Sequence, residues 1–143
     1  MELAVAFLAD AVIVQDGKFY VWGGGIDTVY APGFPTAANV SLLARVTFEP
    51  SECDRPHTVE VNTIDEDGKP VAPSMPPQAV IPQRDLADST LQVGNLTVLT
   101  FRGLPFPKPS KIIFSILVDG RELGSIKLRA VQASPAPAGW QKS

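Results

Sequence analysis

The chain has few of the residues that build catalytic and metal centres. Its 143 residues include one cysteine and one histidine, Cys53 and His57. A single cysteine cannot form an internal disulfide, and one cysteine with one histidine cannot complete the four-ligand site of a structural zinc ion. We therefore expect no disulfide framework, no metal and no cofactor, and we expect the chain not to be an enzyme.

Charge and long apolar runs are also scarce. Charged residues make up 19% of the chain, and the net charge is −3, which argues against the basic face of a nucleic-acid binder. No run reaches the ~18 apolar residues that span a bilayer. Residues 3–9 are apolar but have no basic start, which makes them a poor signal peptide. The lone thiol and the missing export signal predict a cytoplasmic protein without nucleic-acid or membrane partners.

The chain is rich in β-strand patterns with a period of two. Apolar residues alternate with mostly polar ones over residues 39–48 and again, less strictly, over residues 111–118. Such alternation is typical of strands with one face toward a core. We expect the following side chains to be core: Val46, Phe48, Phe114 and Ile116.

Three Asp-Gly pairs lie between these β-rich segments, at residues 16–17, 67–68 and 119–120. Asp-Gly between such segments predicts a hairpin, because glycine accepts the positive φ of tight turns. A long strand over residues 91–101 should carry a bulge near Gly94. The fold class that we predict is all-β: a single antiparallel two-sheet β-sandwich of about eight or nine strands. A partly closed barrel is the alternative. The domain should span residues 1–132, and residues 133–143 form an Ala/Pro-rich flexible tail.

Two local motifs permit a functional and a structural interpretation. The run Gly23-Gly24-Gly25 could cradle a phosphate, but the segment after it is strand-like, which favours a bend between two sheets. Cys53 and His57 stand four residues apart and could form a thiol nucleophile with its base. Neither a Gly-rich oxyanion loop nor a helix start accompanies that pair, so we interpret it as coincidence.

Five short motifs follow one another along the chain: Leu8-Ala9-Asp10-Ala11, Trp22-Gly23-Gly24-Gly25, Gly33-Phe34-Pro35, Arg55-Pro56-His57 and Val118-Asp119-Gly120. In these motifs the chain resembles a family of small, mainly bacterial proteins catalogued only as a domain of unknown function. The resemblance covers residues 2–131. It implies an immunoglobulin-like sandwich and no known activity, so it supplies no catalytic residues.

Two classes of function remain. A non-enzymatic protein-binding or assembly module would use apolar residues left outside the core, with another protein or a second copy of the chain as partner. The candidates for this role are Leu43, Ile113 and Leu117, which should point away from the core face, and Trp140 in the tail.

The alternative is a carbohydrate or small-ligand binding domain with its site at the glycine run. Its candidate contacts are Trp22, Gly23, Gly24, Gly25, Asp27, Tyr30 and Phe34. A concave pocket near residues 23–34 would favour this ligand site, whereas a flat apolar face would favour assembly.

Overall fold

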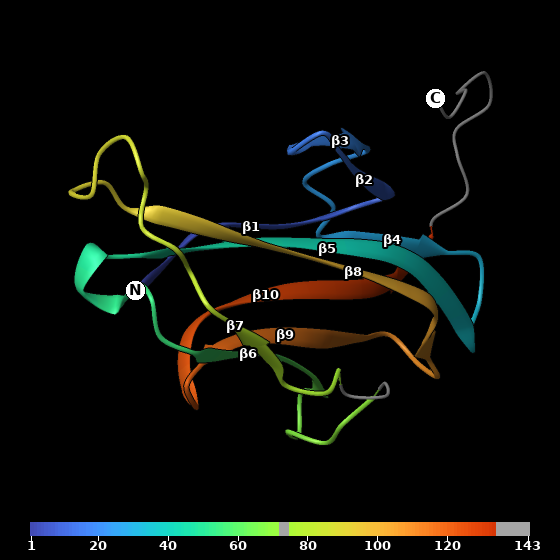
Figure 1. Cartoon of the computed structure of the whole chain (residues 1–143). Coiled ribbons are helices and arrows are strands. Elements are labelled where there is room, and N and C mark those ends of the chain that lie inside the picture. The colour runs from blue at the N-terminus through green and yellow to red at the C-terminus, as the bar shows by residue number, and fades with distance from the viewer. Residues whose placement is uncertain (72–74, 134–143) are drawn as a thin grey trace.

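The fold is built from ten strands and one short 3₁₀ turn, seen in a computed structural model that describes residues 1–71 and 75–133 (Figure 1). The strands are β1 (Glu2–Ala9), β2 (Ala11–Gln15), β3 (Lys18–Trp22), β4 (Thr28–Ala31), β5 (Thr36–Phe48), β6 (His57–Asp65), β7 (Gln78–Val80), β8 (Val93–Phe106), β9 (Ser110–Val118) and β10 (Arg121–Gln132). The 3₁₀ turn η1 covers Pro50–Glu52. The prediction of an all-β chain is confirmed.

Two large sheets face each other. One has the strand order β1-β5-β8 and the other has the order β4-β10-β9-β6-β7. Figure 1 shows them as two stacked layers, with β5 above β9 and β10. The alternating apolar residues of β5 and β9 meet between the layers, as the sequence pattern predicted. All four predicted core side chains are at most 1% exposed: Val46, Phe48, Phe114 and Ile116.

The number of sheets differs from the prediction. Strands β2 and β3 pair only with each other and form a third sheet, which lies on the outer side of β1-β5-β8 (Figure 1). This hairpin is apolar on both faces, so neither face matches the half-polar outer strand of a two-sheet sandwich. The sheets are also not wholly antiparallel, because β4 pairs with β10 in parallel. These two strands lie far apart in sequence, so no short turn fixes their relative direction.

All three predicted hairpins turn the chain back on itself, but only two of them join two strands of a sheet. Asp16-Gly17 and Asp119-Gly120 each form a two-residue turn with positive φ at both residues. The third pair, at residues 67–68, follows β6 and leads into a short return segment. The backbone N–H of Asp65 donates to the Lys69 carbonyl at 2.9 Å, and that of Val71 donates to the Thr63 carbonyl at 3.1 Å, on either side of the isolated bridge between Ile64 and Pro70.

The predicted bulge lies elsewhere. Gly94 pairs regularly with Thr47, and the register shift occurs near the other end of β8, at Gly103. Gly103 has a φ of +69°, which suits a bulge residue in the left-handed region. Gly94 instead makes room for a side chain, because a Cβ there would lie 2.3 Å from Nε of Arg45.

Candidate functional site

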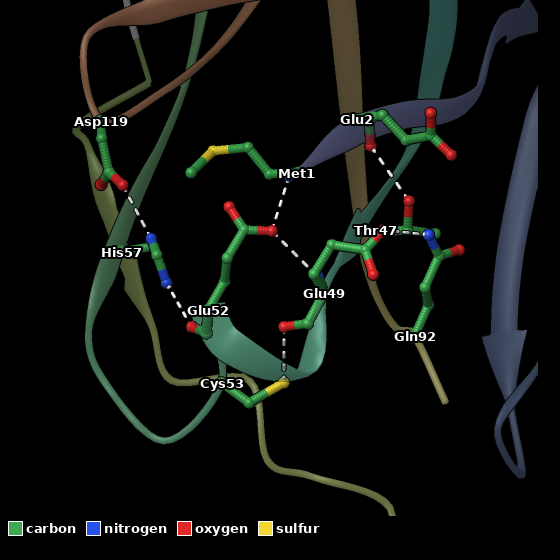
Figure 2. A network of polar contacts seen from close by, with 9 residues as sticks. All are labelled: Met1, Glu2, Thr47, Glu49, Glu52, Cys53, His57, Gln92 and Asp119. Atoms are coloured by element: carbon green, nitrogen blue, oxygen red, sulfur yellow. Dashed lines mark hydrogen bonds and ion pairs between the residues drawn. The ribbon is translucent and has the colours of Figure 1, made fainter. Parts of the chain in front are cut away.

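The Cys53–His57 segment forms a buried polar network where η1 leads into β6. Figure 2 shows the His57 ring between two oxygen atoms. Nδ1 lies 2.7 Å from Oδ2 of Asp119, and Nε2 lies 2.6 Å from the carbonyl oxygen of Glu52. The ring packs against Phe48 with centroids 4.9 Å apart, and the residue is only 4% exposed. The sequence singled out His57 as a neighbour of Cys53, but it did not indicate Asp119, which lies 62 residues away.

The two oxygen partners determine the charge of His57. A carboxylate and a carbonyl both accept, so both ring nitrogens must donate, and only the imidazolium has two N–H groups. Burial is the largest single influence and lowers the pKa of His57. The hydrogen bonds to Asp119 and the Glu52 carbonyl, together with the Asp119 charge, outweigh burial, so the pKa is raised above 6.5. The hydrogen bond to His57 in turn lowers the pKa of Asp119 below 3.8.

Neighbouring groups complete this network. The α-ammonium of Met1 lies 2.6 Å from Oε1 of Glu52, and this contact lowers the pKa of that carboxyl group. The backbone N–H of Glu49 donates to the same carboxylate at 2.9 Å. Figure 2 shows how Glu52 thereby ties the start of β1 to the end of β5.

Cys53 lies beside His57 without forming a catalytic pair with it. The thiol is buried and donates to the carbonyl oxygen of Glu49, with Sγ 3.5 Å from that atom. Both ring nitrogens of His57 are engaged elsewhere. A cysteine nucleophile needs a base within reach and access for its substrate. This arrangement supplies neither, and it serves to join η1, β6 and the β9–β10 turn.

The glycine run forms the bend that the sequence favoured. It leads the chain from the β2–β3 sheet to β4 at the edge of the five-stranded sheet. Gly23 and Gly25 have φ values of +62° and +85°, and the backbone N–H of Gly25 donates to the Leu8 carbonyl at 2.9 Å. A Cβ at position 23 would lie 2.1 Å from Oδ2 of Asp10, so a side chain has no room there.

The residues predicted for a small-ligand site are spread over several elements. Trp22 lies on β3 and Tyr30 on β4, both exposed, whereas Phe34 is half-buried against the core. Asp27 lines a shallow hollow of about 210 Å³ together with Lys111, Lys127 and Arg129. None of the three aromatic residues is part of that lining.

The predicted partner residues also differ in their placement. Leu43 does point away from the central core, but it is 0% exposed and therefore cannot contact a partner. It pairs with Phe7 on β1 and with Val98 on β8. The β2–β3 hairpin lies on this side of the sheet, so a third layer replaces solvent (Figure 1). Trp140 lies outside the described residues.

Ile113 and Leu117 are half-buried on the outer face of β9. Leu117 stands between Glu60 and Glu122 on the neighbouring strands. Ile113 has Lys127 on one side. Charged side chains thus interrupt the predicted apolar face.

The largest group of exposed apolar side chains lies on the β2–β3 hairpin. Ile13 opposes Tyr20 on one face, and Val14 opposes Phe19 on the other. The exposed fractions in the hairpin are 49% for Ile13, 50% for Val14, 44% for Phe19, 47% for Tyr20 and 54% for Trp22. Near its base the hairpin approaches β1. A Cβ added at Gly24 would lie 3.0 Å from the side chain of Val21 on β3 and 3.7 Å from that of Phe7 on β1. Its outer half therefore presents apolar side chains on both faces.

The sequence contains a pattern that indicates this surface. The segments AVIVQ and KFYVW are apolar at nearly every position, and a turn of two residues joins them. A two-stranded hairpin can bury at most part of such a surface within its own chain. Of its residues, only Trp22 was among the predicted contacts.

The chain matches the family model of the family of unknown function DUF6941 over residues 4–131. The chain belongs to this family. A search of curated proteins finds no match. The DUF6941 match begins within β1 and ends within β10, so it includes the hairpin, the glycine run and the His57 network.

Within residues 1–71 and 75–133, no helix is long and apolar enough to cross a membrane. In the same residues no three or more His, Cys, Asp and Glu side chains form a group that could hold a metal ion.

Proposed function

We propose that this member of the DUF6941 family is a non-enzymatic protein-binding module and that the β2–β3 hairpin is its binding element. The observation that supports this proposal is the exposure of five large apolar side chains on the two faces of one short hairpin. Clusters of this kind mark protein–protein sites, whereas single exposed apolar residues are ordinary.

The size of the surface supports the proposal. An aromatic side chain buries about 150–250 Å² when fully covered, so the three half-exposed aromatics offer on the order of 300 Å². That area lies within the range of the largest apolar patch on a typical monomer, about 300–600 Å², and such patches are often functional. The contacts we assign to the partner are Ile13, Val14, Phe19, Tyr20 and Trp22.

The shape of the hairpin indicates the chemistry of the partner. A partner that binds one side would cover either the Ile13–Tyr20 face or the Val14–Phe19 face. An apolar cleft with two walls would cover both faces. The exposed ends of the turn, Asp16 and Lys18, would then meet a polar rim.

The polar network supports the non-enzymatic part of the proposal. His57 is buried with both nitrogens engaged, and Cys53 donates to a backbone carbonyl. We also keep the cytoplasm as the proposed location, for which the lone thiol is the support.

The test uses charge placed on each face of the hairpin. Tyr20→Asp and Phe19→Asp should each weaken capture of a partner from an extract of the host, compared with the wild-type chain as bait. Loss of an interface aromatic costs about 2 kcal/mol or more, which is roughly a 30-fold weaker Kd. Leu86→Asp is the matched control, because Leu86 is fully exposed and lies outside the hairpin.

An apolar dye supplies a readout that needs no partner. Fluorescence of 8-anilinonaphthalene-1-sulfonate should fall when residues 11–22 are deleted, and it should stay unchanged in Leu86→Asp. If the deleted protein captures the same host proteins as the wild type, the hairpin is not the binding element and the proposal is wrong.

A further inference from the structure

Strand β8 has a free edge beside a groove. It ends the order β1-β5-β8, and among residues 1–71 and 75–133 no backbone hydrogen bond reaches its second edge. Residues 93–101 of β8 contain no charge and no proline, and Arg102, the bulge at Gly103 and Pro105 follow them. Proteins usually protect an edge strand by shortness, charge or proline, because free N–H and C=O groups accept another strand.

The edges of the other large sheet have that protection. β7 has three residues and lies between Pro77 and Pro82. β4 has four residues and is followed by Pro32. β1 forms the second edge of the sheet that contains β8, and it lies beside β10. The contrast identifies β8 as the long edge that remains open.

The groove lies next to the second half of β8. Its volume is about 520 Å³, and its lining includes Val61 and Thr63 from β6 and Leu99, Phe101 and Leu104 from β8. Val71 and Met75, which lie between β6 and β7 in the chain, also line it. These side chains border the core between the two large sheets. A strand added to this edge of β8 would direct every second side chain into the groove.

The hairpin of the same chain has the properties of such a strand. β2 and β3 have five residues each, and the segment of β8 that borders the groove covers residues 99–105. Both hairpin strands have an edge outside their mutual pairing, and both carry exposed apolar side chains. At its turn the hairpin has an exposed Asp16 and an exposed Lys18, and Asp16 supplies the charge opposite to that of the exposed Arg102 in the groove.

We propose that the β8 edge and its groove bind the β2–β3 hairpin of a second copy of this chain. One hairpin strand pairs with β8 through backbone hydrogen bonds, and its side chains enter the groove. This inference rests on the proposed function and adds the identity of the partner. A stable interface needs about 800 Å² per partner. Tyr20 and Trp22 share one face of the hairpin, which can enter the groove, and they contribute on the order of 200 Å² to that area. The backbone of the pairing strand, Ile13 and the turn add to it.

The test separates the two halves of the interface. One variant lacks residues 11–22 and joins Asp10 to Gly23, whose backbones are already close, with Asp10 N 3.3 Å from Gly23 O. It keeps the groove and lacks the hairpin. The other variant, Leu99→Glu, keeps the hairpin and places a charge in the groove. Leu96→Glu is the matched control, since Leu96 is also half-buried on β8 but does not line the groove.

Sedimentation of each protein at ~100 μM, well above a micromolar Kd, gives the readout. The wild type and Leu96→Glu should associate, and each of the two half-interface variants should be monomeric alone. An equimolar mixture of those two variants should form a 1:1 complex. Monomeric wild type at this concentration would overturn the inference, and so would a deletion variant that associates like the wild type.

A second measurement covers the case in which Leu99→Glu fails to fold. Tyr20→Cys and Thr100→Cys change exposed residues, and a mixture of the two should form a mixed disulfide under mild oxidation. Thr100→Cys mixed with Ser125→Cys, an exposed residue of β10, is the control. Equal cross-linking in both mixtures would contradict the inference. A monomeric wild type whose hairpin still captures a host protein would leave the proposed function intact and remove only the self-docking.

Discussion

At the scale of single residues, His57 shows how a buried charge is accommodated. Its two acceptors lie on different elements, Asp119 in the β9–β10 turn and the Glu52 carbonyl in η1. Asp119 also accepts the backbone N–H of Thr58 at 2.9 Å through its second oxygen. The ion pair therefore fixes the start of β6 against two other segments.

This ion pair predicts a pH dependence of stability. The pKa of His57 is raised in the folded protein, so its contribution is complete below 6.5 and is lost as the pH rises through the folded value. The pKa of Asp119 is lowered, so its contribution is complete above 3.8 and is lost as the pH falls through the folded value. Between 3.8 and 6.5 both contributions are present.

Asp119→Asn tests this linkage. Asparagine tolerates the φ of +53° at this turn but carries no charge, so the pKa of His57 should fall. We expect a loss of about 1 kcal/mol near pH 6, a modest figure because Asp119 is partly exposed. The decline in stability from about pH 6 to about pH 9 should also become smaller than in the wild type. Urea melts across this range provide the measurement, and an unchanged decline would count against the ion pair.

Glycine at position 23 provides a second test at the scale of the residue. Gly23 and Gly25 both have positive φ, but only Gly23 would place a Cβ against another residue, Asp10. Gly25→Ala should cost about 1–2 kcal/mol from backbone strain alone. Gly23→Ala should cost about 1 kcal/mol more because of the added contact. Thermal melts of the two variants compare them directly, and equal losses would show that Asp10 simply moves aside.

At the scale of the element, the sequence could predict what adjacent residues determine. Two Asp-Gly hairpins and the core faces of β5 and β9 were predicted, because turn chemistry and alternation act over a few positions. The third hairpin is also present, as a short return segment that pairs with β6 up to Val71. The parallel β4–β10 pair and the Asp119 partner of His57 depend on contacts across about 60 to 100 residues. The hairpin on the side of Leu43 belongs to strands that end more than 20 residues before it. Patterns within one strand carry no information about such contacts.

The core strand β9 supports a quantitative prediction at this scale. Phe114 is 0% exposed and forms an edge-to-face contact with Phe101, with ring centroids 5.2 Å apart. Phe114→Ala should lower the free energy of unfolding by about 3–5 kcal/mol. Ile113→Ala on the half-buried outer face of the same strand is the comparison and should cost less. Denaturant melts measure both, and a loss below about 1 kcal/mol for Phe114→Ala would place that residue outside the core.

At the scale of the whole molecule, the hairpin and the β8 edge lie on different parts of one body. The hairpin lies on the outer side of the three-stranded sheet (Figure 1), whereas the groove lies beside β6 and β8. When the hairpin of one copy docks in the groove of another, the pair still has one free hairpin and one free groove. These two can dock with each other and close a two-fold dimer, or they can bind further copies. Self-docking thus gives either a reciprocal dimer or a larger assembly, and the two differ in how they end.

This geometry predicts how the assembly ends. The variant without residues 11–22 can receive a hairpin but cannot offer one, so it should terminate a growing chain. Light scattering of the wild type should show a mean mass that rises with concentration. Adding an excess of the deletion variant should lower that mass toward a dimer. Leu99→Glu offers a hairpin but blocks the groove, so an excess of it should end growth at the opposite end of the assembly and lower the mean mass as well. A closed two-fold dimer would keep its mass as its concentration rises, and neither capping variant would shorten it stepwise. Such a result would show that two copies exchange hairpins reciprocally.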